Sequence, residues 1–314
     1  MGLDIVVAFF ILGAAAQLLR SPLSIPEGLY QSLVILLLLA IGLKGGIALS
    51  EHLTTTLLLQ CLGILAMGVV LPLLAFPILA QIGQMPRISA ATIAAHYGSV
   101  SVATYAVGVA FLESRNIPYE PYFPLFVAVL EAPAIAVGLW LARENRKAKQ
   151  SGRGELVREV MLNQGMVLLL GGLLIGWLAS DQTERIMPLF GGLFHGVLAL
   201  FLLAMGQKAA QRWREMGRDA SFLASFGVAM PLMGALLATA VALPMGLSAG
   251  GAILLAVLGA SASYIAVPAA FSVAMPKADL GPAITASLGV TFPFNVLVGI
   301  PLYSALILNF FPVA

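Results

Sequence analysis

The chain has 314 residues, of which 60% are hydrophobic and only 10% are charged. A soluble domain of this length carries about a quarter charged residues, so the composition excludes one and indicates a polytopic membrane protein. Sixteen basic residues nearly balance fourteen acidic ones, which argues against nucleic-acid binding, and the single cysteine excludes an internal disulfide or a multi-thiolate metal site.

Uncharged runs long enough to cross a bilayer follow one another along the chain. A spanning helix needs roughly 20 mostly apolar residues. The run 220–276 is too long for one crossing, and we expect Pro244-Met245-Gly246 to divide it into two helices. The sequence therefore predicts an all-α fold with ten transmembrane helices, over 5–19, 28–43, 52–86, 88–112, 121–142, 160–180, 186–207, the two parts of 220–276, and 280–314.

Half of the charges lie in two short segments, 143–159 and 208–219. With ten spans both segments share one side of the membrane, which then holds 13 of the 16 basic residues. The positive-inside rule places that side in the cytoplasm and both termini outside, as expected for a protein of the cell inner membrane. We interpret these charges as solvated topology anchors, with a lipid-headgroup or regulatory site as the alternative. Asp4 stands where a cleavable signal peptide would be basic, so we expect none.

Short motifs recur in the second half of the chain at nearly constant spacing. Ala40-Ile-Gly-Leu-Lys44 corresponds to Ala204-Met-Gly-Gln-Lys208, and Gly98-Ser-Val-Ser-Val102 corresponds to Gly259-Ala-Ser-Ala-Ser263. Each match is weak alone, but their order and spacing together predict a duplicated five-helix unit.

The predicted copies are residues 1–142 and 160–314, joined by a basic cytoplasmic loop at 143–159. Because five is odd, the second copy inserts upside down relative to the first. Such a 5+5 inverted repeat is typical of secondary transporters, whose binding site lies near the membrane midplane where the copies meet.

Small polar residues cluster in the middle of the fourth and ninth predicted helices. A helix in hydrocarbon can break only where its freed backbone groups face protein or a polar cavity, and glycine and serine suit such a break. Two discontinuous helices would offer N-termini to a small anion and oxygen atoms to sodium. Close helix packing is the alternative explanation for the same residues. The predicted substrate-binding residues are Gly98, Ser99, Ser101, Thr104, Gly259, Ser261 and Ser263.

Glu131 is the only acidic residue deep within a predicted span. An acid in this position is costly and indicates function, here cation coordination or proton coupling. A structural carboxyl that braces the break at Pro133 is the alternative. The predicted cation-binding residues are Glu131, Ser101, Ser263, Thr291 and Asn295, with sodium as the only metal. Candidates for lining the same cavity are His96, Tyr97 and Tyr264, whereas we interpret His195 as a packing residue.

The sequence lacks the motifs of zinc peptidases and ATP-binding P-loops. We therefore expect a secondary transporter rather than an enzyme, with no organic cofactor. A passive anion channel remains an alternative, because a selectivity filter need not have a recognisable motif.

Several segments together resemble the sodium-dependent bicarbonate transporters of the SbtA type. They are Gly42-Leu-Lys-Gly-Gly46, Ser101 to Thr104, Leu112-Glu-Ser114, Ile117-Pro-Tyr-Glu120 and Gly299-Ile-Pro-Leu-Tyr303. The resemblance covers essentially the whole chain and implies a homotrimer in the lipid bilayer. It also implies a scaffold of helices one, two, six and seven and a mobile core that moves by an elevator mechanism. Bicarbonate would bind where helices four and nine cross, with co-transported Na+ beside it.

The chain departs from well-known cyanobacterial members of that family in three places. Those members read Ser-Gly-Ser-Thr where it has Ser101-Val-Ala-Thr104, and they carry Asp where it has Glu131 and Tyr264. In those members the region corresponding to 143–159 is longer and cytoplasmic, and a PII-like regulator inhibits transport, so control by such a partner is a hypothesis for this chain. The leading hypothesis is a sodium-coupled symporter that imports bicarbonate. The alternative is a carrier of another small anion or carboxylate, coupled to protons through Glu131.

Overall fold

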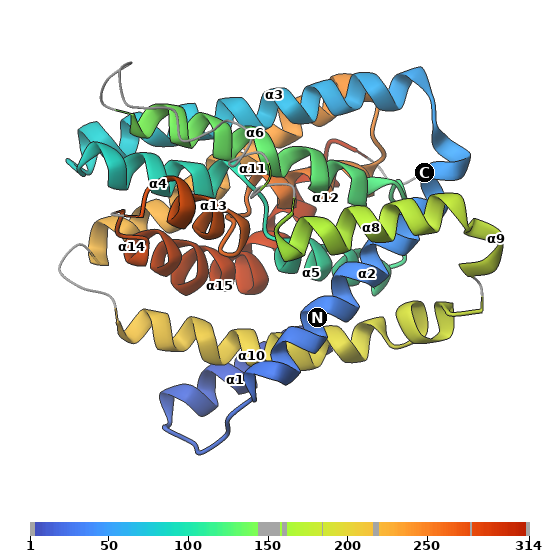
Figure 1. The fold of residues 1–314 in the computed structure, drawn as a ribbon, viewed down its shortest axis with the longest axis horizontal. Coiled ribbons are helices and arrows are strands. Elements are labelled where there is room, and N and C mark those ends of the chain that lie inside the picture. Colours follow the sequence, from blue (N-terminus) through green and yellow to red (C-terminus); the bar gives the residue numbers. More distant parts are fainter. Residues whose placement is uncertain are drawn as a thin grey trace.

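The computed structural model describes residues 4–143, 158, 162–183, 185–215, 220–276 and 278–311. Within these ranges the regular secondary structure is helical, as the composition predicted (Figure 1). Of the predicted cytoplasmic loop 143–159, only Arg143 and Arg158 belong to the described residues. The predicted regulator-binding segment otherwise lies outside them.

The first half of the chain forms α1 (Ile5–Leu18), α2 (Glu27–His52), α3 (Thr55–Pro77), the π-helical extension η1 (Ile78–Ile82), α4 (Arg87–Gly98), α5 (Val102–Glu113) and α6 (Phe123–Ala142). The second half begins with α8 (Gln164–Leu178), α9 (Ser180–Thr183), η2 (Pro188–Gly192), α10 (Phe194–Arg214), α11 (Ala220–Met245), α12 (Ala249–Gly259) and α13 (Ala266–Ala274). It closes with α14 (Gly281–Ile284), the π-helix η3 (Thr285–Thr291), α15 (Phe292–Phe294), the π-helix η4 (Asn295–Gly299) and α16 (Ile300–Ile307).

Short polar side chains fix several helix starts by accepting a hydrogen bond from a backbone N–H in the first turn. These N-cap residues are Asp4, Thr54, Ser101, Asn163 and Ser248. The turn between α11 and α12 uses Gly246, whose φ of 66° is the left-handed conformation that glycine tolerates best. The predicted division of the run 220–276 is therefore confirmed.

Among the described residues, six helical segments are long and apolar enough to cross a membrane. They are Glu27–His52, Thr55–Ile82, Arg87–Glu113, Phe123–Ala142, Ser221–Met245 and Gly281–Ile307. Three shorter apolar helices accompany them, at Ile5–Leu18, Gln164–Leu178 and Ala249–Gly259. This agrees with a polytopic membrane protein, while ten spans and their inverted repeat stay predictions.

The outer surface also suits a bilayer. Trp140, Trp177 and Trp213 are all exposed near helix ends, where indole rings partition to the membrane–water interface. Along α3, exposed leucines such as Leu58 and Leu62 form an apolar face that water would not solvate well.

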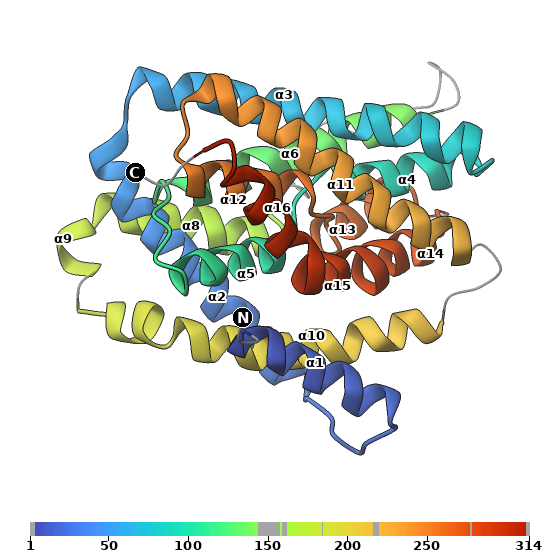
Figure 2. The same cartoon turned by 180° about the vertical axis from the view of Figure 1, so that it is seen from behind.

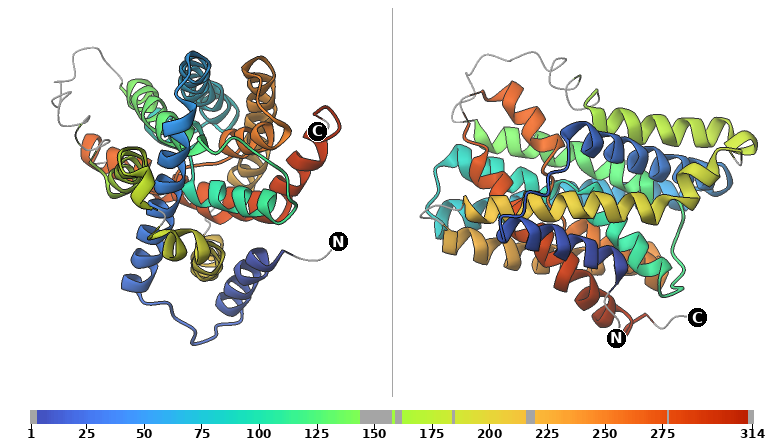
Figure 3. Two further views of the ribbon diagram at one scale, coloured as in Figure 1. Left: turned by 90° about the vertical axis from the view of Figure 1, so that its right-hand side faces the viewer. Right: turned by 90° about the horizontal axis from the view of Figure 1, so that it is seen from below.

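Four helices pack as two tight pairs, α1 along α10 and α2 along α8 (Figure 3). Glycines bring their backbones together: a Cβ on Gly13 would meet the Leu203 carbonyl, and one on Gly42 would meet backbone of α8. We call α1, α2, α8 and α10 the first helix group, and the helices α3–α6 and α11–α16 the second. The first group contains the four helices that the resemblance assigns to the scaffold, a role that stays a prediction.

Candidate functional site

Two helices of the second group are interrupted near the middle of the molecule. α4 ends at Gly98 and α5 begins at Val102, while α12 ends at Gly259 and α13 begins at Ala266. The structure thus interrupts both helices at the serine-containing clusters where the sequence predicted breaks. Figure 2 shows α5 and α12 side by side, seen from behind.

The two breaks are hydrogen-bonded to each other. The backbone N–H of Ser101 donates to Ser261 Oγ at 3.0 Å, and the backbone N–H of Ser263 donates to the His96 carbonyl at 2.8 Å. All four residues are buried. Backbone groups released by one broken helix are thereby satisfied by the other, which is the condition for non-helical backbone at membrane depth.

A cavity of about 80 Å³ lies where the breaks face the first helix group. This volume exceeds the roughly 15 Å³ that one water needs, so a small ion has room. From the second group the cavity is lined by residues that the sequence analysis singled out, namely Ser101, Glu131, Ser263 and Tyr264. From the first group it is lined by the apolar side chains Val34, Leu37, Leu38 and Phe201, and by the start of α8.

Helix N-termini face this cavity. Val102 and Ala103, at the start of α5, line it, and so does Ala266, the first residue of α13. The Ser101 hydroxyl accepts from the Thr104 N–H at 3.2 Å and caps α5, and the Ser263 hydroxyl accepts from the Val267 N–H in the first turn of α13 at 3.5 Å. Free N–H groups and the positive end of the helix dipole favour an anion at such a place.

Glu131 reaches the same cavity from α6 and is only 6% exposed. In the described part of the chain no hydrogen bond or ion pair involves its carboxyl group. A structural carboxyl that braces the helix at Pro133 would need such a partner. The geometry therefore favours a group that is available to a ligand over a structural brace.

Thr291 and Asn295 lie elsewhere, outside the lining of this cavity. Thr291 Oγ1 is 2.7 Å from the Tyr97 hydroxyl and donates to the Gly227 carbonyl at 2.7 Å. Asn295 Nδ2 donates to the Ala260 carbonyl at 2.8 Å, and its Oδ1 accepts from the Tyr303 hydroxyl at 2.9 Å. The structure therefore does not gather the predicted cation-binding residues into one cluster.

Gly98 and Gly259 serve close packing rather than unusual backbone geometry. A Cβ on Gly98 would overlap Pro72 of α3, and one on Gly259 would meet the Gly234 backbone of α11. Among the described glycines only Gly246 has a positive φ. Gly98 and Gly259 are therefore required for the absence of a side chain rather than for a positive φ.

His96 and Ser99 border the first break but lie outside the cavity lining. The His96 ring is fully buried, and its Nδ1 donates to the Thr92 carbonyl at 2.7 Å. Within the described ranges, His96 Nε2 and Ser99 Oγ have no hydrogen-bond partner. Tyr97, another predicted cavity-lining residue, also lies outside the lining, and its hydroxyl contacts Thr291 instead.

Sequence reasoning missed the start of α8 as part of the cavity wall. Asn163 caps this helix by accepting from the Met166 N–H at 3.0 Å, and Gln164 and Gly165 line the cavity beside it. An Asn ahead of an apolar run is a helix-start signal. Nothing in the sequence indicated that this start faces the breaks.

No curated protein matches the chain. The model of a family described as the Na+-dependent bicarbonate transporter superfamily matches residues 5–308, which include both breaks and the cavity. Since this is a family of transporters, the expectation of a transporter rather than an enzyme is confirmed. The chain belongs to the Na+-dependent bicarbonate transporter superfamily.

Proposed function

We propose that the protein is a symporter that uses the sodium gradient to import bicarbonate across the cell inner membrane. The observation that carries this proposal is the cavity between the two helix groups, where two broken helices direct their N-termini toward a buried carboxyl. Membership of the family supplies the substrate and the coupling ion as the first candidates.

The charges in the cavity suggest a reason for coupling. Bicarbonate bound at the starts of α5 and α13 would lie in the same small space as the Glu131 carboxylate. Two negative charges in a poorly hydrated site repel each other strongly. A sodium ion in that space attracts both, so each ion binds better when the other is present. Ser101 and Ser263 add hydroxyl oxygens to the same cavity.

The two helix groups suggest how the cavity changes sides. In the proposed elevator movement, the first group stays fixed at the trimer interface and the second group carries the cavity across the membrane. The predicted inverted repeat supports this proposal, because two copies of opposite orientation can form inward-open and outward-open states of similar energy. The basic side, including loop 143–159, faces the cytoplasm in this arrangement, and a PII-like regulator there remains part of the hypothesis.

The test is uptake of radiolabelled bicarbonate into proteoliposomes with an inward sodium gradient. We expect accumulation that disappears when potassium replaces sodium, and no accumulation in liposomes without protein. Equal uptake in sodium and potassium would contradict sodium coupling. Uptake that never exceeds the external concentration would indicate a channel.

A second candidate keeps the cavity but changes the ion and the cargo. Glu131 has no partner among the described residues, so it is also suited to carry a proton with another small anion or carboxylate. In that case an inward proton gradient drives uptake without sodium, and Glu131→Gln removes the pH dependence. An unchanged pH profile in this variant would exclude the proton-coupled carrier.

A further inference from the structure

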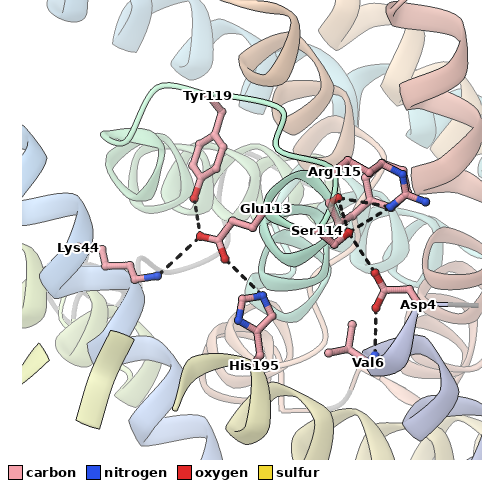
Figure 4. Close-up of polar contacts among 9 residues, drawn as sticks. Asp4, Val6, Lys44, Glu113, Ser114, Arg115, Tyr119 and His195 are labelled. Atoms are coloured by element: carbon pink, nitrogen blue, oxygen red, sulfur yellow. Dashed lines mark hydrogen bonds and ion pairs between the residues drawn. The ribbon is translucent and has the colours of Figure 1, made fainter. Parts of the chain in front are cut away.

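The C-terminal end of α5 carries a polar cluster that lies away from the cavity at its N-terminal end. Glu113 Oε1 is 3.7 Å from Lys44 Nζ, and Glu113 Oε2 is 3.4 Å from His195 Nε2 (Figure 4). The Tyr119 hydroxyl donates to Glu113 Oε1 at 3.2 Å. Burial, together with the negative charge of Glu113, raises the pKa of Tyr119, so its hydroxyl keeps the proton that it donates.

These contacts join the two helix groups. Lys44 belongs to α2 and His195 to α10, both of the first group, whereas Glu113 ends α5 of the second. The next residue, Ser114, donates to Asp4 Oδ2 at 3.4 Å, and Asp4 caps α1 (Figure 4). The end of α5 is thus held by three of the four helices of the first group. The sequence analysis had interpreted His195 as a packing residue, which misses this contact.

α5 is suited to couple a displacement of its C-terminal end to the cavity at its N-terminal end. Its 12 residues span about 18 Å as a straight helix. Every residue from Ala103 to Leu112 is buried, so the helix is held by packing along this length. Its first turn lines the candidate substrate cavity, and its last residue is Glu113. A shift of this end relative to the first group therefore shifts the cavity wall as well.

The surroundings of the cluster allow its ion pairs to break. A second cavity, of about 350 Å³, adjoins it and is lined by Lys44, Glu51, Tyr105, Tyr119 and Phe194 among others. The Lys44 and Glu113 side chains are 35% and 30% exposed. Ion pairs with this exposure are weak enough to break during a functional cycle.

We propose that Glu113 is a positioning residue, which latches the second helix group to Lys44 and His195 of the first and so favours the arrangement of the two groups seen here. This inference rests on the proposed movement of the two groups. It assigns to Glu113 no contact with the substrate: the residue acts through the position of α5. In each transport cycle the contacts of Glu113 with Lys44 and His195 break once. When they form again, they favour the arrangement of the two helix groups seen in this structure.

The test measures conformation without needing transport. The natural Cys61 is replaced by serine, and Ile265→Cys places a reporter on the half-exposed lining of the substrate cavity. An impermeant thiol reagent is then applied from each side of proteoliposomes, in the absence of bicarbonate. Glu113→Gln keeps the size of the side chain and removes its charge, and we expect it to raise labelling from the less reactive side by roughly two- to fivefold, as a partly exposed ion pair allows.

The charge exchange Lys44→Glu with Glu113→Lys should return labelling toward the starting ratio, while either substitution alone should not. His195→Gln should shift labelling in the same direction as Glu113→Gln, and Glu51→Gln, in the neighbouring cavity, should have no effect. Unchanged labelling in Glu113→Gln would overturn the proposal, and so would failure of the exchange to restore it. A labelling shift without bicarbonate uptake would uphold the latch and contradict the proposed function, so the two failures are distinguishable.

Discussion

Glu131 in the first half and Asn295 in the second are strongly polar side chains on helices beside the two breaks, and they differ in what they contact. Asn295 uses both ends of its amide, toward the Ala260 carbonyl and the Tyr303 hydroxyl. Glu131 lines the cavity and, within the described ranges, has no such bond. We infer that the second half of the chain supplies hydrogen bonds that brace the fold and the first half supplies the charge, so the site is asymmetric between the two halves.

The largest expected effect follows from removing that charge. If Glu131 holds the sodium ion, Glu131→Gln should lower sodium-driven bicarbonate uptake more than tenfold, because the anion loses its counter-charge. The measurement is initial uptake in proteoliposomes, with Glu215→Gln, an exposed acid, as the matched control. Uptake in Glu131→Gln within twofold of the wild type would contradict the assignment of the charge.

Asn295 should show the opposite behaviour, with the main effect on stability. Asn295→Ala leaves the buried Ala260 carbonyl and the Tyr303 hydroxyl without their partner, which costs about 1–3 kcal/mol in the free energy of unfolding. Thermal unfolding in detergent measures this loss. Glu131→Gln should leave the unfolding temperature unchanged. If this variant loses as much stability as Asn295→Ala, the distinction between a bracing Asn295 and a ligand-binding Glu131 is contradicted.

The two serines of the second break allow a finer separation. Ser261→Ala removes the acceptor for the Ser101 N–H and should cost about 1 kcal/mol of stability. Ser263 bonds across the break through its backbone N–H, so Ser263→Ala keeps that bond and loses only the long 3.5 Å bond from the Val267 N–H while it changes the cavity lining. We expect Ser263→Ala to reduce uptake more than stability, and the reverse for Ser261→Ala. Equal profiles for the two variants would refute this separation.

The smallest effect concerns Lys208, the lysine that corresponds to Lys44 in the predicted repeat. Lys208 lies 3.1 Å from Glu27, and both residues belong to the first helix group. Lys208→Gln should therefore change stability by less than about 1 kcal/mol and leave the reporter labelling unchanged. A labelling shift as large as that in Glu113→Gln would show that the latch is not confined to the Lys44 end.

Much of the helical layout followed from local sequence chemistry. The breaks could be predicted because Gly98-Ser-Val-Ser-Val102 and its counterpart near Gly259 concentrate small polar residues within apolar runs. Glu131 stood out because an acid deep in an apolar helix is costly. These signals lie in a few neighbouring residues and need no knowledge of the packing.

The side-chain partners could not be predicted in the same way. Thr291 ends η3 and Asn295 begins η4, and both segments are π-helical. A π-turn adds a residue to the turn, so the face on which a side chain emerges departs from the 3.6-residue period. The sequence did not predict that the start of α8 lines the cavity, for a different reason. Its proximity to the breaks depends on how α2 and α8 pack.

The most direct test of the account is equilibrium binding of bicarbonate to the purified protein, measured with and without sodium. We predict that sodium increases the affinity at least about tenfold, that bicarbonate increases the affinity for sodium by the same factor, and that Glu131→Gln removes both effects. If bicarbonate affinity is the same in sodium and in potassium, both in the wild type and in Glu131→Gln, the account is contradicted. The sodium ion would then not lie between bicarbonate and the Glu131 carboxylate in the cavity.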